Sequence, residues 1–308
     1  MIKYVIKRLL MLIPVIIGVS FLVYFIMSLT PGDPAKIMLG DTATVEEIQQ
    51  MHEELGLDDP IIIRYGRYML GLLHGDLGNS YTTGRSVFTE VFSRFPATLT
   101  LTFWSMLIAI VISIPIGIIS ATKQYSFIDS FSMIFALLGI SIPNFWLGLM
   151  LIIAFSVNLG WLPTGGFSGA ASIILPAITL GTGCAANITR TTRSSMLEVI
   201  RQDFIRTAKS KGVSKRKVIN KHALRNALIP VVTIIGLQFG QLLGGAVLTE
   251  TVFSWPGIGQ YLVNSINGKD TNAVTGSIII FAVCFSLVNL LVDVVYGFID
   301  PRIKAEYQ

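Results

Sequence analysis

The chain contains long stretches without a single aspartate, glutamate, lysine or arginine. Five such stretches occupy residues 9–32, 95–122, 130–189, 226–249 and 271–292. Ionised side chains are costly at the centre of a lipid bilayer, and a helix needs about 20 apolar residues to cross it. Each stretch is long enough for a crossing. The pattern therefore predicts an integral membrane protein.

Composition and the continuity of these stretches define the fold class. Charged residues make up 13% of the chain and hydrophobic residues 52%, whereas about 25% of the residues of a soluble globular protein are charged. The strands of a membrane barrel alternate apolar and polar residues over about 10 positions, which these stretches do not. The turn-rich residues 158–166 divide the third stretch into two spans. We therefore expect an all-α protein with six transmembrane helices.

The positions of lysine and arginine predict the orientation of the spans. If the amino terminus is cytoplasmic, 17 of these residues lie inside and six outside, in agreement with the positive-inside rule. Both termini are then cytoplasmic. The expected organisation is a cytoplasmic N-terminus and first span over 1–29, an extracytoplasmic segment over 30–96, a membrane core over 97–300 with a cytoplasmic loop at 190–225, and a tail over 301–308.

The extracytoplasmic segment 30–96 is expected to contain two short helices. Thr44 and Glu47 form a capping box before an apolar pattern of helical period. Asp59 and Pro60 predict the start of a second helix, with Asp59 as its N-cap. Such helices either cap the membrane bundle or dock a soluble partner, and the sequence leaves both open.

The cytoplasmic loop 190–225 predicts a helix, a tight turn and a second helix. Ser195 and Glu198 form a capping box, Gly212 is expected to end the first helix, and Ser214 to cap the second. One apolar stripe is expected on the first helix, formed by Met196, Leu197, Ile200, Phe204 and Ala208. Because this stripe has no evident core of its own to enter, the sequence favours a partner protein with a groove.

Two alternative functions of this loop, DNA binding and lipid binding, fit the sequence less well. Short helices with many basic residues are also typical of a DNA-binding helix-turn-helix, but this loop is short and tethered at both ends. Nucleic acid is therefore not an expected partner. Binding of lipid headgroups fits Lys215, Arg216 and Lys217, although it leaves the apolar stripe unexplained.

A membrane-embedded enzyme is the remaining alternative. The three histidines, His52, His74 and His222, all lie outside the predicted spans, and no span holds a pair of carboxylates. Cys184 and Cys284 fall within spans, where cysteine usually serves as a small packing residue. We therefore expect no catalytic site, no disulfide and no metal site.

Polar residues within the spans mark a candidate solute path. Ser141, Asn144, Gln238 and Gln241 are the side chains expected to face the interior of the bundle. Gly236, Gly240 and Gly244 recur every four residues, which allows close approach of another helix. Asp293 is expected to form a structural ion pair rather than a proton relay.

Several motifs, taken in order, resemble the inner-membrane permease subunits of ATP-binding-cassette importers, specifically the dipeptide, oligopeptide, glutathione and nickel group. The resemblance covers nearly the whole chain. It is carried by Pro31-Gly32-Asp33-Pro34, Leu55-Gly56-Leu57-Asp58-Asp59-Pro60, Gly75-Asp76-Leu77-Gly78, Arg206-Thr207-Ala208-Lys209-Ser210-Lys211-Gly212, His222-Ala223-Leu224-Arg225-Asn226-Ala227, the segment from Thr249 to Gly259, and Asp300-Pro301-Arg302.

This resemblance implies a type I importer permease fold and a role for the cytoplasmic hairpin as the element that couples to an ATPase. Arg206-Thr207-Ala208 stands where most importers have Glu-Ala-Ala, and Arg225 stands where they have proline; the peptide group shares both departures. Residues 269–274 depart from the group's Arg-Asp-Tyr-Pro pattern. The implied coupling residues are Ser195, Leu197, Ile200, Asp203, Phe204, Arg206, Thr207, Ala208, Gly212 and His222, and the implied gate or docking residues are Glu250, Trp255 and Asp270.

The resemblance also implies the partners and the mechanism. The chain is expected in the bacterial inner membrane with a second homologous permease, two ATPase subunits that bind ATP and magnesium, and an extracytoplasmic solute-binding protein. The chain itself is expected to bind no cofactor. Transport is expected to proceed by alternating access. The sequence does not decide whether the solute is a small peptide, glutathione, nickel or a metallophore complex.

Overall fold

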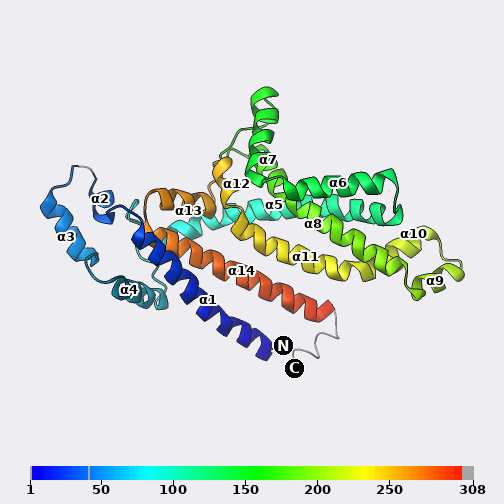
Figure 1. Ribbon diagram of the computed structural model, residues 1–308, viewed down its shortest axis with the longest axis horizontal. Helices are drawn as coiled ribbons and strands as arrows, with labels where there is room; N and C mark the ends of the chain where they lie inside the picture. Colours follow the sequence, from blue (N-terminus) through cyan, green and yellow to red (C-terminus); the bar gives the residue numbers. More distant parts are fainter. Residues whose placement is uncertain (1, 41, 300–308) are drawn as a thin grey trace. The chain divides into compact units, whose positions relative to one another are not determined.

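The computed structural model describes residues 2–40 and 42–299, and it shows a helical protein (Figure 1). The motif at 300–302 and the expected tail at 301–308 lie outside the described residues. The α-helices are α1 (Ile2–Leu29), α2 (Pro34–Leu39), α3 (Val45–Leu55), α4 (Ile61–Leu73), α5 (Val87–Thr122), α6 (Phe127–Ser141), α7 (Asn144–Leu151), α8 (Ile174–Ile200), α9 (Asp203–Ser210), α10 (Lys215–Lys217), α11 (Leu224–Gly245), α12 (Val247–Val252), α13 (Ile258–Asn267) and α14 (Thr271–Ile299).

Five of the described helices are long and apolar enough to cross a membrane, and a bent pair of helices adds a sixth candidate. The single helices cover Val5–Leu29, Val87–Thr122, Ala170–Ile200, Lys215–Gly245 and Thr271–Val294. The third of these begins with a 3-10 turn, Ala170–Ile173, and the fourth includes a π-helical segment, Val218–Ala223. The six predicted spans are thus all present as helical segments.

The sixth candidate span, which begins after Ser126, is bent. It consists of α6 followed by α7 and its π-helical continuation, Ile152–Asn158, and the two parts are bent by 103°. Pro143 lies at the bend, and Ile142 before it has φ −80° and ψ 123°. A proline disfavours the helical conformation of the preceding residue. The first of the two spans predicted within residues 130–189 is therefore broken at this proline.

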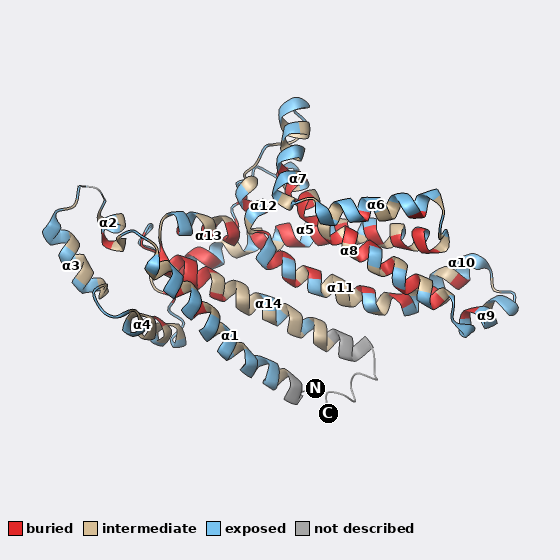
Figure 2. Cartoon of the chain, viewed as in Figure 1, coloured by how far each residue is buried: buried red, intermediate tan, exposed pale blue. Residues whose placement is uncertain are grey.

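The chain divides into two compact units. Of the described residues, unit 1 contains 2–5, 99–255 and 285–299, and unit 2 contains 6–98 (without 41) and 256–284. Within unit 1, α8 is central and packs on α6, α7 and α11. Its buried residues are shown in red in Figure 2. Gly181 allows α8 to approach α5 closely, because an added β-carbon there would lie 2.8 Å from the Ser105 carbonyl oxygen.

Unit 2 has two small apolar cores. One joins the start of α5 to α13 and α14, and it includes Leu77, Val87, Ile258 and Ala273. In the other core, Tyr24 of α1 packs with Tyr68 of α4 and Ile279 of α14. These contacts tie the segment 30–96 to α1 and to the beginning of α14.

The short helices of this segment test two capping predictions. The capping box of Thr44 and Glu47 is present at the start of α3, which confirms the first. The second helix, α4, begins one residue later than expected and lacks a side-chain cap. Pro60 keeps an extended conformation (φ −51°, ψ 141°) and itself occupies the capping position, while Asp59 forms an ion pair with Arg67.

Candidate functional site

A polar cavity of about 270 Å³ lies in unit 1, where α6, α7, α8 and α11 meet. Its polar side chains come from four amides and one thiol, and the rest of its wall is glycine, leucine and isoleucine. The polar residues are Asn144, Cys184, Asn187, Gln238 and Gln241.

Local structure explains how these side chains converge. The bend at Pro143 places Asn144 at the first position of α7. On α8, Asn187 Nδ2 donates to the Gly183 carbonyl oxygen one turn earlier at 3.3 Å. Gln238 of α11 is buried and lines the same cavity as Cys184 of α8. The cavity therefore offers both donors and acceptors, and none of the described residues that line it is an aspartate, glutamate, lysine, arginine or histidine.

Three of the four expected path residues, Asn144, Gln238 and Gln241, line this cavity. Ser141 is exposed at the end of α6 and does not. Sequence reasoning missed Asn187 and treated Cys184 only as a packing residue. The signal was their spacing: Gly183 and Cys184 lie about one helical turn before Asn187, so all three residues share one face of α8.

The expected gate or docking residues are all buried. Trp255 is fully buried and packs edge-to-face on Phe167, with 5.1 Å between ring centroids. Glu250 is buried in α12, and its carbonyl oxygen accepts a hydrogen bond from the Trp255 N–H at 2.8 Å. Neither side chain forms part of an exposed docking surface in this conformation.

Asp270 has a structural role in unit 2. One carboxylate oxygen accepts hydrogen bonds from Ser80 Oγ at 2.5 Å and from the Thr82 N–H at 3.2 Å. The other accepts from the Ala273 N–H at 3.0 Å, which caps the first turn of α14. A buried carboxylate with these donors joins the loop after α4 to α14, so it is not available to an external partner.

The hairpin at 190–225 differs from its expected form at its first helix. Ser195 is buried inside α8, which continues to Ile200, so the capping box predicted at Ser195 and Glu198 was wrong. The break falls at Arg201 and Gln202, and α9 begins at Asp203. A capping sequence within a longer amphipathic pattern does not stop a helix when both sides pack on neighbouring helices.

The apolar stripe is also largely covered by the chain itself. Met196 is fully buried in a core with Ala121 of α5 and Ile205 of α9, and Leu197, Ile200 and Ala208 pack against that core. The expectation that this stripe lacks a core of its own was wrong. The break at residues 201–202 turns α9, so that Ile205 rather than Phe204 faces inward. Phe204 remains 40% exposed.

The outer surface of the hairpin is formed by α9 and the turn that follows it. Asp203 and Arg206 form a long, exposed ion pair, with 3.8 Å between Nη1 and Oδ1. Gly212 has φ 77° and follows the end of α9, as the sequence predicted. Ser214 occupies the N-cap position of α10 but makes no side-chain capping bond. His222 is half-buried in the π-helical segment.

A buried ion pair, which sequence reasoning missed, supports the hairpin from within unit 1. Arg193 of α8 binds Asp129 of α6 with two hydrogen bonds, 2.6 Å from Nε to Oδ1 and 2.8 Å from Nη2 to Oδ2. Ser120 Oγ of α5 and the Tyr125 N–H also donate to this carboxylate. Three helices, α5, α6 and α8, are thereby joined about one turn before Met196 and its core.

Among the described residues, no group of three or more histidine, cysteine or acidic side chains is placed to hold a metal ion. Unit 1 thus has a polar cavity among α6, α7, α8 and α11 and, beyond the C-terminal end of α8, a hairpin that exposes Phe204. This combination defines the class as a membrane permease.

Comparison with known proteins places the chain in a family. Residues 113–305 match the binding-protein-dependent transport system inner membrane component, and residues 1–102 match the N-terminal region of such membrane components. The dipeptide transport system permease protein DppB of Alkalihalophilus pseudofirmus is 45% identical over 332 residues, covering 99% of this chain and 100% of that protein. The glutathione transport system permease protein GsiC of Escherichia coli K12 is 46% identical over 304 residues and 99% of both chains. The chain belongs to the binding-protein-dependent transport permeases of the inner membrane.

Solved structures agree on the fold. An inward-facing structure of the MetNI methionine ABC transporter has a chain that matches with a TM-score of 0.58 and 21% identity, over 68% of this chain and 96% of that one. A structure of an amino acid ABC transporter with histidines matches with a TM-score of 0.53 and 15% identity, over 70% of this chain and 94% of that one. The fold is that of an ABC importer permease, and the chain is a transport subunit rather than an enzyme.

Proposed function

We propose that this permease forms half of the path by which an ATP-driven importer takes up a dipeptide or glutathione. The observation that carries the proposal is the uncharged, amide-lined cavity of unit 1 in a chain about 45% identical to a dipeptide and a glutathione permease. Both solutes carry peptide groups that amide side chains can hydrogen-bond. The long segment before α5, which resembles the first of the two permeases in such systems, supports a second, homologous permease as partner.

The distribution of basic residues supports the orientation. With 17 lysines and arginines on one side and six on the other, the side that holds the hairpin is cytoplasmic. The segment 30–96 then faces the solute-binding protein, and the hairpin faces two ATPase subunits that bind ATP and magnesium. Glu250 and Trp255, which are buried beside each other, then belong to the extracytoplasmic end of the path.

The coupling surface is the exposed part of the hairpin. Phe204 supplies an apolar anchor, and Asp203, Arg206, Thr207 and Gly212 surround it. The remaining expected residues, Ser195, Leu197, Ile200, Ala208 and His222, support this surface from within the hairpin. The core around Met196 then transmits movement of the hairpin to α5, α8 and α11, and partners can bias two conformations only by binding them unequally.

Uptake by proteoliposomes that contain the assembled transporter tests the solute path. We expect labelled dipeptide or glutathione to accumulate, and Asn187→Leu to lower its accumulation while ATPase assembly stays normal. Asn226→Leu is the matched control, because this amide lies on α11 outside the cavity lining. Equal uptake by the Asn187 variant and the control would contradict the placement of the path.

Co-purification of the ATPases tests the coupling surface. Phe204→Asp should release them in detergent, since a charge replaces the exposed apolar anchor. Val45→Asp, an exposed apolar residue at the start of α3, is the control and should retain them. Retention by both variants would assign docking to another part of the hairpin.

A further inference from the structure

A second polar cavity, of about 220 Å³, lies in unit 2 between α4, the end of α1 and the loop after α4. Its wall differs from that of the unit 1 cavity because it carries charges of both signs and several aromatic rings. The side chains that matter are Tyr24, Arg64, Arg67, Tyr68, Asp76 and Tyr81.

Arg64 and Arg67 are two basic residues on the wall of this cavity. Arg64 Nη1 donates to the Leu57 carbonyl oxygen at 3.4 Å, and the residue lines the cavity together with Tyr24 and Tyr81. Among the described residues it forms no ion pair with a carboxylate, whereas Arg67 pairs with Asp59. A guanidinium oriented in this way matches the geometry of a phosphate group.

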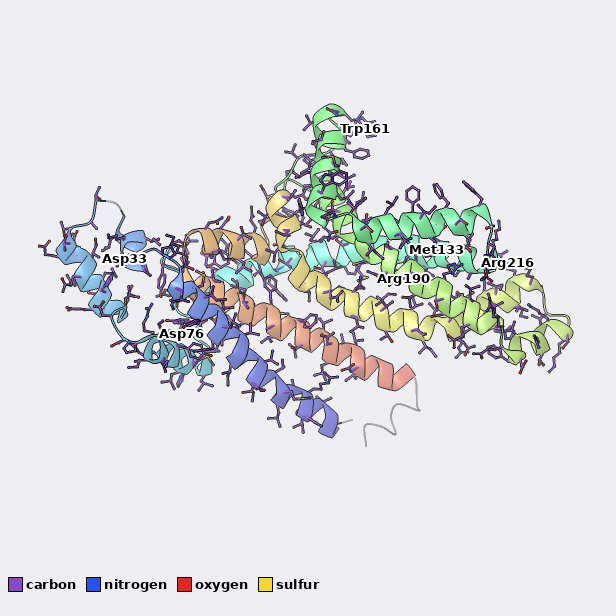
Figure 3. The ribbon with its side chains drawn as sticks, in the orientation of Figure 1. Asp33, Asp76, Met133, Trp161, Arg190 and Arg216 are labelled. Atoms are coloured by element: carbon purple, nitrogen blue, oxygen red, sulfur yellow. The ribbon has the colours of Figure 1, made fainter. Side chains whose placement is uncertain are left out.

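Asp76 supplies the opposite charge on the same wall. One of its carboxylate oxygens accepts the Gly78 N–H at 2.8 Å. Figure 3 labels Asp76, which follows the end of α4. The tyrosine rings that line the cavity have electron-rich faces that attract a cation, and Tyr68 has a buried hydroxyl group without a hydrogen-bond partner among the described residues. The cavity therefore suits a zwitterion with a phosphate and an ammonium group.

The outer face of α4 is apolar and uncovered. Ile62, Ile63, Leu70 and Leu73 are 76%, 52%, 61% and 78% exposed. They lie on one side of the helix, next to the side that carries Arg64 and Arg67. Water alone is an unfavourable neighbour for such a face.

The opposite side of α4 packs on a membrane-crossing helix. The Tyr65 hydroxyl donates to the Ile17 carbonyl oxygen at 3.0 Å, and its ring packs edge-to-face on Phe21 with 5.2 Å between centroids. Ile17 and Phe21 both lie within the candidate span Val5–Leu29 of α1. α4 therefore lies alongside a candidate span whose Phe21, Leu22 and Ile26 are also exposed.

We propose that this cavity binds the headgroup of a zwitterionic phospholipid, with its phosphate at Arg64, its ethanolamine ammonium at Asp76 and its acyl chains along Ile62, Ile63, Leu70 and Leu73. A lipid accounts for the cavity and the apolar face together. A soluble partner would account for only one of them, because α4 lies beside the apolar part of α1. This site is separate from the solute path and does not depend on the proposed function.

Native mass spectrometry of the assembled transporter tests the proposal. The delipidated complex in detergent is titrated with dioleoylphosphatidylethanolamine, and bound lipid is counted. Arg64→Gln should weaken binding about tenfold, the loss expected for one charge-assisted hydrogen bond. Lys36→Gln is the matched control, because this exposed lysine of the same segment lies outside the cavity. Equal lipid retention by the Arg64 variant and the control would overturn the site.

Two further variants separate headgroup from tail and keep the test decisive if Arg64→Gln fails to assemble. Asp76→Asn keeps an oxygen for the Gly78 N–H and should abolish the preference for phosphatidylethanolamine over phosphatidylglycerol. Leu70→Asn should weaken the binding of both lipids. Displacement of the lipid by equimolar soluble phosphoethanolamine would overturn the proposal, since the acyl chains would then contribute nothing. So would a Leu70 variant that lowers the affinity for the solute-binding protein but retains its lipid.

Discussion

The Asp129 carboxylate of unit 1 accepts hydrogen bonds from Arg193, Ser120 and the Tyr125 N–H. Its side chain is only 5% exposed. A buried ion pair gains little over an apolar pair of equal volume, but removing one partner leaves an uncompensated charge and costs about 3 to 5 kcal/mol. The pair therefore fixes which residues of α6 and α8 lie opposite each other.

We expect Arg193→Gln to lower the melting temperature of the purified complex, because Asp129 then stays buried without its cation. The loss is about 3 kcal/mol. Arg206→Gln is the control, since its pair with Asp203 joins side chains that are 81% and 96% exposed, and such pairs contribute between about 0 and 1 kcal/mol. Similar melting temperatures for the two variants would contradict the structural role of the buried pair.

His52 makes the stability of α3 depend on pH. Its ring contacts Asp33 at 2.8 Å and Asp58 at 3.2 Å. The hydrogen bond to Asp33 is the main cause that raises the pKa of His52 above 6.5; burial opposes it. The pKa of Asp33 is lowered below 3.8 by hydrogen bonds from His52 and Ala35, which outweigh burial. The stabilisation is complete between these values, and it is lost as pH rises through the folded pKa of His52 or falls through that of Asp33.

After correction for intrinsic rates, amide hydrogen exchange of residues 45–55 should therefore be about two- to fivefold faster at pH 9 than at pH 6. This fold-change is the size expected when a partly exposed ion pair is lost. In His52→Gln this ratio should fall to one. The capping box of Thr44 and Glu47 contains no group that titrates in this range, so its effect on the start of α3 is the same at both pH values. A pH effect that persists in the variant would assign it to another group.

Among the elements, α11 shows which of three evenly spaced glycines have a packing role. A β-carbon at Gly236 would overlap Val292 of α14, and one at Gly240 would lie 3.4 Å from Phe285. Gly244 has no neighbour within 4 Å. The seam expected from the sequence is therefore a packing contact over its first two positions only.

Two identical substitutions test this difference. Gly236→Ala should destabilise the complex by about 1 to 3 kcal/mol through overpacking. Gly244→Ala should stabilise it by up to about 1 kcal/mol, because alanine has the higher helix propensity and meets open space. The melting temperatures of the two purified variants should thus move in opposite directions, and a shift of the same sign would contradict the seam.

The elements also show where the sequence was sufficient and where it was not. Charge-free stretches located every span, and the Thr44 capping box located α3. The bend at Pro143 was overlooked because apolar composition continues through it, although the residue before a proline is a probable helix boundary. The break before Asp203 and the pairing of Asp129 with Arg193 depend on tertiary contacts, since neither residue type nor spacing signals them.

At the scale of the whole molecule, the family was predictable from ordered motifs, while the cavity was predictable only in part. Asn144, Gln238 and Gln241 stood out as polar residues in apolar spans. Asn187 did not, because its position relative to them depends on how α8 packs against α6 and α11. The burial of Asp270 and Trp255 likewise required the fold, since a polar or aromatic residue near a span end gives no sign of its depth.

Coupling across the molecule provides a further prediction at Gly212. This residue has φ 77°, and a β-carbon there would meet nothing within 4 Å, so only its backbone conformation restricts substitution. Gly212→Val should strain the turn by about 1 to 3 kcal/mol and lower the ratio of uptake to ATP hydrolysis in proteoliposomes by about tenfold. Gly212→Asn, which tolerates this conformation, should keep the ratio. Loss in both variants, or in neither, would contradict the role of the turn.

The carboxamide groups that line the unit 1 cavity affect how strongly a solute can bind there. Each amide group donates and accepts at once, much as water does, and no lining side chain carries a permanent charge. An anionic solute and a zwitterionic solute would both contact an uncharged wall, so neither would form an ion pair there. If this cavity is the solute path, as proposed, it would bind its solute weakly and release it quickly, and selection between solutes would depend on the solute-binding protein.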